Sequence, residues 1–236
     1  MSGASIDPSP PRGLFIEHQA DAHPGYLGDR AVERGADVVI HAPAAGAFPD
    51  PCDFDFVVAL GSSDAAYDDT LSYGEAERAL LKEAVERDVP VLGVCFGAQM
   101  LARTLGGEVR RMERPEIGWA AVETTEPALI EPGPWLTWHF DAFITPPGAV
   151  QIARTPQAAQ AFVHGPHLGV QFHPEATVSS VASWARTYAD VIAGAGGSVD
   201  ALNAETRRRA ARARAAAHRL FDRFWDRALA ARAASR

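Results

Sequence analysis

The sequence predicts an α/β fold, with a doubly wound and mostly parallel sheet, an antiparallel extension of that sheet and a C-terminal helix. Three observations support this prediction. Short apolar runs alternate with segments of helical spacing up to residue 107, short β-like pieces between Pro- and Gly-rich turns fill residues 108–170, and the last segment is rich in Ala and Arg. Alternation of apolar strands with helices is typical of a parallel sheet that helices cover on both faces.

The first part of the chain supplies the parallel strands and their helices. Its apolar runs predict four strands, at Leu14–His18, Asp37–His41, Phe54–Leu60 and Val89–Val94. Apolar residues at helical spacing predict three helices, at Gly25–Arg34, Glu75–Arg87 and Gln99–Leu105. This alternation predicts a flavodoxin-like sheet, in which ligands bind beyond the carboxyl ends of the strands.

Residues 108–170 contain short β-like segments between turns, in place of the alternating strands and helices. Short pieces at Ala120–Thr124, Val150–Ala153 and Ala161–Val163 predict antiparallel strands that extend the sheet. Leu168–Phe172 predicts one further strand, and Val178–Ala193 predicts the helix that follows it. Residues 109–114 (VRRMER) are mostly charged, which indicates a solvated strand edge and not a phosphate site.

The last segment predicts a long amphipathic helix. Apolar residues recur at three- and four-residue intervals over Asp200–Arg232, with arginines elsewhere. The large side chains Leu220, Phe221, Phe224 and Trp225 favour packing on the body of the protein or on a second copy, so a homodimer is one expectation. A basic helix that recruits nucleic acid or a partner enzyme is the alternative.

Composition predicts one domain with short additions at its ends. At 236 residues and 47% hydrophobic content, the chain can bury one substantial core. Residues 1–12 are Ser- and Pro-rich and are expected to be a disordered lead-in, residues 13–197 form the domain, and residues 198–236 form the terminal helix. No run approaches the roughly 18 to 20 apolar residues of a membrane span, and the N-terminus lacks a hydrophobic signal core. We therefore expect a cytoplasmic protein with no membrane partner.

Charge argues against nucleic-acid binding by the body of the protein. The net charge is −8, but residues 198–236 hold ten Arg against four acidic residues, about +6. The remainder then holds 12 basic and 26 acidic residues, about −14. An acidic surface repels phosphate, so we expect no nucleic-acid partner.

One glycine-framed cysteine carries the clearest chemical signal. Gly93-Val94-Cys95-Phe96-Gly97 lies between an apolar strand and an apolar helix, in the pattern of a strained turn that lifts a nucleophile off the sheet edge. Glycines are needed because a Cβ at either side would meet neighbouring backbone. The start of the following helix favours the thiolate form of Cys95 through its free N–H groups and dipole. The other cysteine, Cys52, shows no such pattern, and the spacing of Cys and His resembles no zinc site, so we expect no metal.

A base and an orienting carboxylate follow 78 residues downstream. His173 comes just after the strand Leu168–Phe172, and Glu175 lies two residues further on, within reach of the imidazole. Gly61, Cys95 and His173 all fall at strand ends, where parallel strands place their ligands. Nucleophile, base and carboxylate predict a catalytic triad for acyl transfer.

The two motifs together resemble the class I (triad-type) glutamine amidotransferases, especially stand-alone proteins similar to the glutaminase domain of GMP synthetase. The resemblance is carried by GVCFGAQMLA and GVQFHPE, and it extends to the PEIGW and WHFD segments that lie between them. It implies hydrolysis of glutamine by Cys95, His173 and Glu175 with no cofactor. It also implies that the ammonia passes to a separate, ATP-dependent synthetase or ligase.

The substrate pocket is predicted from the same resemblance and from the chemistry. The oxyanion of the tetrahedral intermediate needs two donors. The backbone N–H of Phe96 is one candidate, and the N–H of Ser62, or of another residue in the Gly61-Ser62-Ser63 turn, is the other. The resemblance implies that this turn is the oxyanion loop. Gln99 lies one helical turn after Cys95 and shares its face. In the family this glutamine contacts the amino-acid end of the substrate.

The segment His139-Phe140-Asp141 departs from the family pattern. Relatives usually have glycine between the His and the Asp, where backbone approaches bound glutamine. Phe140 either reshapes the pocket for another γ-glutamyl compound or points outward. Three interpretations therefore stay open: a glutaminase that serves a separate acceptor, a hydrolase of γ-glutamyl amides or peptides, and an inactive binding or regulatory protein on the same scaffold.

Overall fold

The computed structural model describes residues 10–235, with side chains to residue 230. The predicted lead-in over residues 1–12 therefore lies mostly outside the described residues, and β1 already begins at Arg12. The strands are β1 (Arg12–Ile16), β2 (Asp37–His41), β3 (Phe56–Ala59), β4 (Val91–Val94), β5 (Val109–Ala120), β6 (Glu123–Thr124), β7 (Trp135–Phe143), β8 (Val150–Arg154), β9 (Ala159–His164) and β10 (His167–Val170). The helices are α1 (Gly25–Glu33), α2 (Gly74–Glu86), α3 (Phe96–Thr104), α4 (Val178–Thr187), α5 (Ala189–Gly194) and α6 (Val199–Ser235), with short 3-10 turns at Pro43–Ala45 and Pro51–Asp53.

The main sheet has eight strands in the order β2-β1-β3-β4-β10-β9-β8-β6. The pairs from β2 to β10 are parallel, and the pairs of β9 with β10 and β8, and of β8 with β6, are antiparallel. Strands β3, β4 and β10 are buried along their whole length, which is why they appear in the sequence as continuous apolar runs. The predicted fold class is confirmed.

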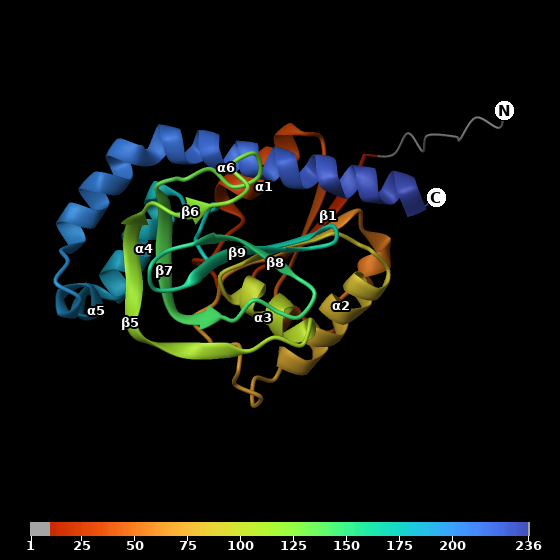
Figure 1. Cartoon of the computed structure of the whole chain (residues 1–236), viewed down its shortest axis with the longest axis horizontal. Coiled ribbons are helices and arrows are strands. Elements are labelled where there is room, and N and C mark those ends of the chain that lie inside the picture. The colour runs from red at the N-terminus through yellow and green to blue at the C-terminus, as the bar shows by residue number, and fades with distance from the viewer. Residues whose placement is uncertain (1–9, 236) are drawn as a thin grey trace.

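Helices cover both faces of this sheet (Figure 1). On one face, α2 and α3 bury Leu80, Leu81 and Leu101 against Val57 and Val91. On the other face, the side chains of α1 and α6 join the cluster that surrounds strands β3, β4 and β10. This double cover leaves the strand ends as the place where loops can form a site.

Helix α6 is 37 residues long and runs along one whole side of the molecule (Figure 1). Phe221, Phe224 and Trp225 surround the ring of Phe56 on β3, with ring centroids 5.5–6.1 Å away. The aromatic residues that suggested a dimer contact are thus buried within this chain, so they give no support to a homodimer. Among the described residues, no helix is both long and apolar enough to cross a bilayer.

Strands β5 and β7 form a separate two-stranded antiparallel sheet, which the sequence did not predict. Their register shifts between Arg111 and Glu116, where β5 bulges. Arg110, Arg111, Glu113 and Arg114 are exposed on β5, as expected for a solvated edge, whereas Val109 is buried. Strand β7 passes over the carboxyl ends of β4 and β10, since the backbone N–H of His173 donates to the carbonyl oxygen of Leu136.

Candidate active site

Cys95 occupies the strained turn between β4 and α3. Its φ of 51° and ψ of −107° lie in a region that side-chain-bearing residues rarely adopt. A Cβ at Gly93 would lie 2.7 Å from the backbone of Ala98, and one at Gly97 would overlap the carbonyl oxygen of Ala59. Glycine at both positions therefore lets α3 begin close enough to the sheet to hold Cys95 in this conformation.

The pairing of β4 with β10 brings Cys95 and His173 to one place. Val94 pairs with Val170, and the backbone N–H of Cys95 donates to the carbonyl oxygen of Val170 at 2.8 Å. His173 follows three residues after that strand. Nδ1 of His173 lies 2.6 Å from Oε1 of Glu175, and both side chains are buried.

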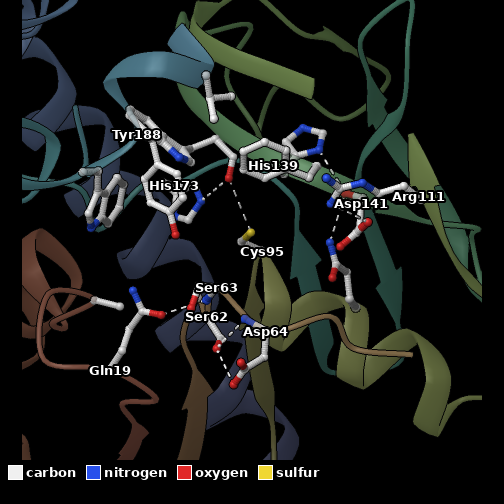
Figure 2. Close-up of a pocket in the computed structure, with 17 residues that line it drawn as sticks. Gln19, Ser62, Ser63, Asp64, Cys95, Arg111, His139, Asp141, His173 and Tyr188 are labelled. Carbon is white, nitrogen blue, oxygen red and sulfur yellow. Dashed lines mark hydrogen bonds and ion pairs between the residues drawn. The ribbon is translucent and has the colours of Figure 1, made fainter. Parts of the chain in front are cut away.

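The carbonyl oxygen of Trp138 on β7 lies between the two reactive groups. It is 3.8 Å from Sγ of Cys95 and 3.2 Å from Nε2 of His173 (Figure 2). Both ring nitrogens of His173 thus face oxygen acceptors, a carboxylate and a carbonyl, and two acceptors call for two N–H donors. The geometry therefore favours the imidazolium form of His173.

The electrostatics agree with that protonation state. Burial by itself lowers the pKa of His173, but the charge of Glu175 and the neighbouring Cys95 raise it, so that the net pKa lies well above the ordinary 6.5. An imidazolium next to a cysteine is the arrangement that stabilises a thiolate.

The turn after β3 lies below Cys95 (Figure 2). A Cβ at Gly61 would lie 3.1 Å from Cε1 of His173, so glycine keeps this side of the histidine open. Among the described residues, the backbone N–H groups of Ser62 and Phe96 have no hydrogen-bond partner, whereas that of Ser63 donates to Oε1 of Gln19 at 2.7 Å. The backbone N–H groups of Ser62 and Phe96 are therefore available as donors near the sulfur.

Side chains behind this turn hold it in shape. Asp64 Oδ2 accepts hydrogen bonds from Ser62 Oγ at 3.2 Å and from the hydroxyl of Tyr73 at 2.5 Å. The ring of Phe96 packs edge-on against His18, whose Nε2 lies 2.9 Å from a carboxylate oxygen of the fully buried Glu77. The loop and the start of α3 are thus fixed by packing that the motifs alone do not reveal.

A pocket of about 340 Å³ opens above Cys95. Of the residues predicted for the site, those that line it are Gly61, Ser62, Cys95, Gln99, His139, Phe140, Asp141 and His173. Glu175 and Phe96 do not line the pocket, and both are buried behind the residues that do. Ser63 and Trp138, from the predicted turn and the WHFD segment, also line it. The sequence predicted no place in the pocket for the further lining residues Gln19, Ala22, Asp64, Arg111, Trp184, Tyr188 and Val191.

Phe140 lines the pocket and does not point away from it. Its ring centroid lies 6.2 Å from that of Tyr188, and the guanidinium of Arg111 stacks 4.9 Å above it. Asp141 lies beside them, with Oδ1 3.4 Å from Arg111 and 3.3 Å from the hydroxyl of Tyr67. Arg111, from the segment expected to be only a solvated edge, is the one Arg or Lys among the described residues that line this pocket.

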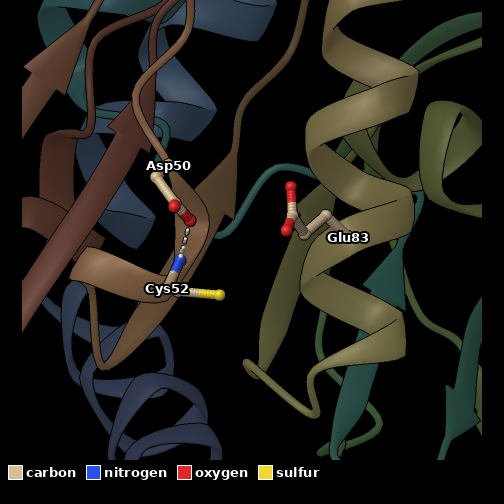
Figure 3. Close-up of side chains that lie close together, drawn as sticks. All are labelled: Asp50, Cys52 and Glu83. Carbon is tan, nitrogen blue, oxygen red and sulfur yellow. Dashed lines mark hydrogen bonds between the residues drawn. The ribbon is translucent and has the colours of Figure 1, made fainter.

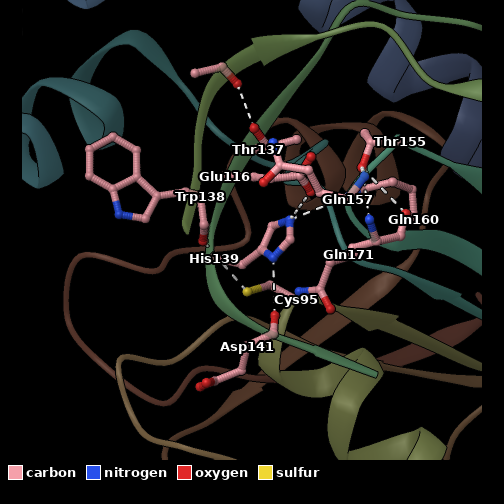
Figure 4. Close-up of polar contacts among 12 residues, drawn as sticks. Cys95, Glu116, Thr137, Trp138, His139, Asp141, Thr155, Gln157, Gln160 and Gln171 are labelled. Carbon is pink, nitrogen blue, oxygen red and sulfur yellow. Dashed lines mark hydrogen bonds and ion pairs between the residues drawn. The ribbon is translucent and has the colours of Figure 1, made fainter. Parts of the chain in front are cut away.

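A buried polar network holds β7 against α3 (Figure 4). His139 Nδ1 donates to the carbonyl oxygen of Asp141 at 3.0 Å, and its Nε2 lies 3.0 Å from Glu116. Gln160 Nε2 donates to Glu116 at 2.8 Å, and Gln99 Nε2 donates to the carbonyl oxygen of Asp141 at 3.0 Å. His139 and Gln99 therefore fix the backbone that carries the Trp138 carbonyl.

Cys52 lies outside the pocket, in an environment unlike that of Cys95. Both cysteines are free, but Cys52 is exposed in the 3-10 turn at Pro51–Asp53, near Asp50 and Glu83 (Figure 3). Partial desolvation, a hydrogen bond with Asp50 and the nearby Glu83 charge raise the pKa of Cys52, which favours the thiol. Asp50 also accepts the backbone N–H of Cys52 and so caps the turn.

Comparison with known proteins identifies relatives of this arrangement. The family model for class-I glutamine amidotransferases matches residues 30–183. A GMP synthase (glutamine-hydrolyzing) of Aeropyrum pernix is 43% identical over 94 residues, which cover 36% of this chain and 18% of that protein. One subunit of the GMP synthase of Sulfolobus acidocaldarius is 38% identical over 98 residues, 37% of this chain and 52% of that protein. The matched part thus spans only about a fifth to a half of these relatives.

Solved structures match over nearly the whole chain. A glutamine amidotransferase from Methylobacillus flagellatus superposes with a TM-score of 0.86 at 26% identity, covering 93% of this chain and 96% of that one. One from Thermotoga maritima gives 0.82 at 27% identity, covering 90% and 97%. Family model, sequence relatives and fold agree, and the chain belongs to the class I glutamine amidotransferases.

Proposed function

We propose that this enzyme hydrolyses the side-chain amide of glutamine through a γ-glutamyl thioester on Cys95 and releases ammonia. The observation that carries the proposal is the convergence of Cys95 Sγ and His173 Nε2 on one carbonyl oxygen at the floor of a pocket. Glu175 holds the imidazolium from behind at 2.6 Å. These are the parts that acyl transfer by a thiolate needs.

The reaction follows from these positions. The Cys95 thiolate attacks the γ-carbonyl carbon, and the oxyanion takes hydrogen bonds from the N–H groups of Ser62 and Phe96. His173 then gives its Nε2 proton to the amide nitrogen, the C–N bond breaks and ammonia leaves. Neutral His173 next takes a proton from water, the hydroxide attacks the thioester, and glutamate leaves as the C–S bond breaks, which restores thiolate and imidazolium.

The far side of the pocket suits the amino-acid end of glutamine. Arg111 supplies a cation for the α-carboxylate, and Asp141 supplies an anion for the α-ammonium group. Gln99 contributes by fixing the backbone of Asp141 through its side-chain amide. Charge-assisted hydrogen bonds of this kind favour a substrate with both charges over a simple amide.

We further propose that the ammonia serves a separate ATP-dependent synthetase or ligase. The similarity to one subunit of the Sulfolobus acidocaldarius GMP synthase supports this proposal, because that relative is one part of an assembly. Residues 13–197 would be the catalytic unit, and the reactive Cys95 fits a reducing cytoplasm, where thiols stay free.

Two substitutions test the mechanism, and the second cysteine provides the matched control. Cys95→Ser is expected to abolish glutamate and ammonia release from glutamine while circular dichroism stays unchanged, whereas Cys52→Ser is expected to keep full activity. Mass spectrometry after rapid quenching is expected to find a γ-glutamyl adduct on Cys95. Turnover by the Cys95→Ser variant would refute the mechanism. Lack of turnover and adduct in the unaltered protein would favour an inactive binding protein.

A hydrolase of larger γ-glutamyl amides is the second candidate function. The position of Phe140 in the pocket wall favours it over a site shaped for glutamine alone. The same triad would act, with water as the final acceptor of the glutamyl group.

A further inference from the structure

Four aromatic side chains form one continuous wall of the pocket, here called the aromatic wall: Trp138, Phe140, Trp184 and Tyr188. The ring centroid of Trp184 lies 5.1 Å from that of His173 and 5.7 Å from that of Trp138. The Tyr188 ring follows at 6.0 Å from Trp138, and Phe140 at 6.2 Å from Tyr188. The wall therefore begins at the catalytic histidine and reaches the stacked guanidinium of Arg111 at the mouth.

The place of His173 determines what this wall contacts during the reaction. His173 must give its proton to the departing nitrogen, so that nitrogen lies within hydrogen-bond reach of Nε2. The glutamyl part of the substrate extends from Cys95 toward the charged pair Arg111 and Asp141, on the other side of the sulfur (Figure 2). Any group attached to the nitrogen then lies on the side of His173, where Trp184 and Tyr188 stand.

Ammonia makes no use of such a surface, because it has no apolar part to bury. The Trp184 indole N–H is already bonded to the carbonyl oxygen of Asp21 at 3.0 Å, so its ring offers only apolar contact. Tyr188 and Phe140 are half-buried, and the Tyr188 hydroxyl has no hydrogen-bond partner among the described residues. A pocket of about 340 Å³ lies at the lower end of the range for ligand pockets, which leaves room for a glutamyl group with a small substituent on its amide nitrogen.

We propose that the His173 end of the aromatic wall, at Trp184 and Tyr188, is the binding site of the leaving amine, and that the preferred substrate is a γ-glutamyl amide whose amine carries an aromatic or other apolar group. This inference rests on the proposed hydrolysis through Cys95. The reaction keeps the same balance: the thiolate forms the C–S bond, the C–N bond breaks, and the His173 proton goes to the amine, which leaves as R–NH₂. Water then converts the thioester to glutamate.

A series of γ-glutamyl amides tests the proposal. The substrates are glutamine, γ-glutamyl methylamide and γ-glutamyl benzylamide, and glutamate release gives kcat/KM for each. The two substituted amides are the matched pair, because both are secondary amides of similar intrinsic reactivity. Burial of the phenyl ring against the wall is expected to raise kcat/KM for the benzylamide about ten- to a hundredfold above that for the methylamide.

Variants at Tyr188 show whether the wall causes the preference. Tyr188→Ala is expected to lower the benzylamide-to-methylamide ratio about tenfold, and Tyr188→Phe, which keeps the ring, is expected to preserve it. Val32→Ala, at an exposed position on α1 away from the pocket, is the control for nonspecific effects. Both kcat/KM values are measured on the same preparation of a variant, so the benzylamide-to-methylamide ratio does not depend on how much of that variant is folded.

The outcomes separate this inference from the proposed function. Cleavage of glutamine without cleavage of the benzylamide overturns the inference and leaves the glutaminase standing. Equal kcat/KM for the two secondary amides, or a ratio that Tyr188→Ala does not change, also overturns it. Cleavage of none of the three substrates overturns both.

Discussion

Replacement of Glu175 by Gln isolates the contribution of one buried charge to catalysis. Oε1 of Glu175 accepts the Nδ1–H of His173 at 2.6 Å, and the carboxylate is 2% exposed, so solvent screens the contact little. Gln keeps the shape and an acceptor oxygen but removes the charge. A hydrogen bond to a charged group contributes about 1.5–3 kcal/mol, and a neutral acceptor retains only part of that.

The expected size of the effect follows from that energy. At about 1.4 kcal/mol per factor of ten, loss of the charge lowers kcat/KM about ten- to a hundredfold. The same loss lowers the pKa of His173, because Glu175 is the main group that raises it against burial. With a lower pKa, the imidazolium of His173 loses its proton at lower pH. The alkaline limb of the kcat/KM profile therefore moves toward lower pH, by about one to two units.

The assay is glutamate release from glutamine between pH 5 and 10, for the unaltered protein and for Glu175→Gln. Glu86→Gln, at an exposed position on α2, is the matched control, for which we expect no change. Oε2 of Glu175 has no partner among the described residues, so the new amide N–H₂ can lack an acceptor, and thermal unfolding of the variant must be checked. An alkaline limb at the same pH in both proteins, with similar kcat/KM, would show that Glu175 does not hold the imidazolium.

Two further predictions concern substrate binding and stability. Arg111→Gln is expected to raise KM for glutamine about tenfold with little change in kcat, because the α-carboxylate loses a cation that is largely exposed to solvent; an unchanged KM would contradict this role. Burial lowers the pKa of His167 to about 4, with a further lowering by His164, and its Nδ1 accepts the backbone N–H of Val91 at 3.3 Å. The unfolded chain takes up this proton near pH 6.5 and the folded one near pH 4, so stability is full above 6.5 and falls as pH falls to 4. About 2.5 pH units at about 1.4 kcal/mol each give roughly 3 kcal/mol. His167→Asn, which keeps an acceptor but cannot titrate, should lessen this acid destabilisation in urea melts at pH 7 and 4.5, and equal pH dependence in both proteins would argue against it.

The sequence predicted the parallel sheet because its central strands are buried on both faces. Strands β3, β4 and β10 consist of contiguous buried residues, which leave an apolar run in the sequence. Strand β7 was missed because His139 and Asp141 interrupt its apolar character, although the polar network buries both. Its partner β5 is bulged, and most of its residues are exposed or only half-buried, so neither a run nor an alternation marks it.

The residues proposed for the site could be found in the sequence in so far as they lie in local motifs. Cys95, His173 and Glu175 each sit in a short pattern that fixes the backbone around them. The contact of Gln19 with the Ser63 N–H joins residues 44 positions apart, and no local pattern marks it. The orientation of Phe140 could not be predicted either, because it depends on how β7 packs against α4 and on the position of Tyr188.

The two sheets contribute different parts of the pocket. The residues of the proposed triad follow the ends of β4 and β10 in the main sheet, whereas Arg111 and Phe140 come from the separate sheet of β5 and β7. The two sheets meet at the active site through the Trp138 carbonyl and the buried network around His139. Side chains that line the pocket from β5 and β7 can therefore change without disturbing the turn that strains Cys95. Selectivity among γ-glutamyl amides should accordingly respond to substitution at position 140, while the catalytic step remains that of the main sheet.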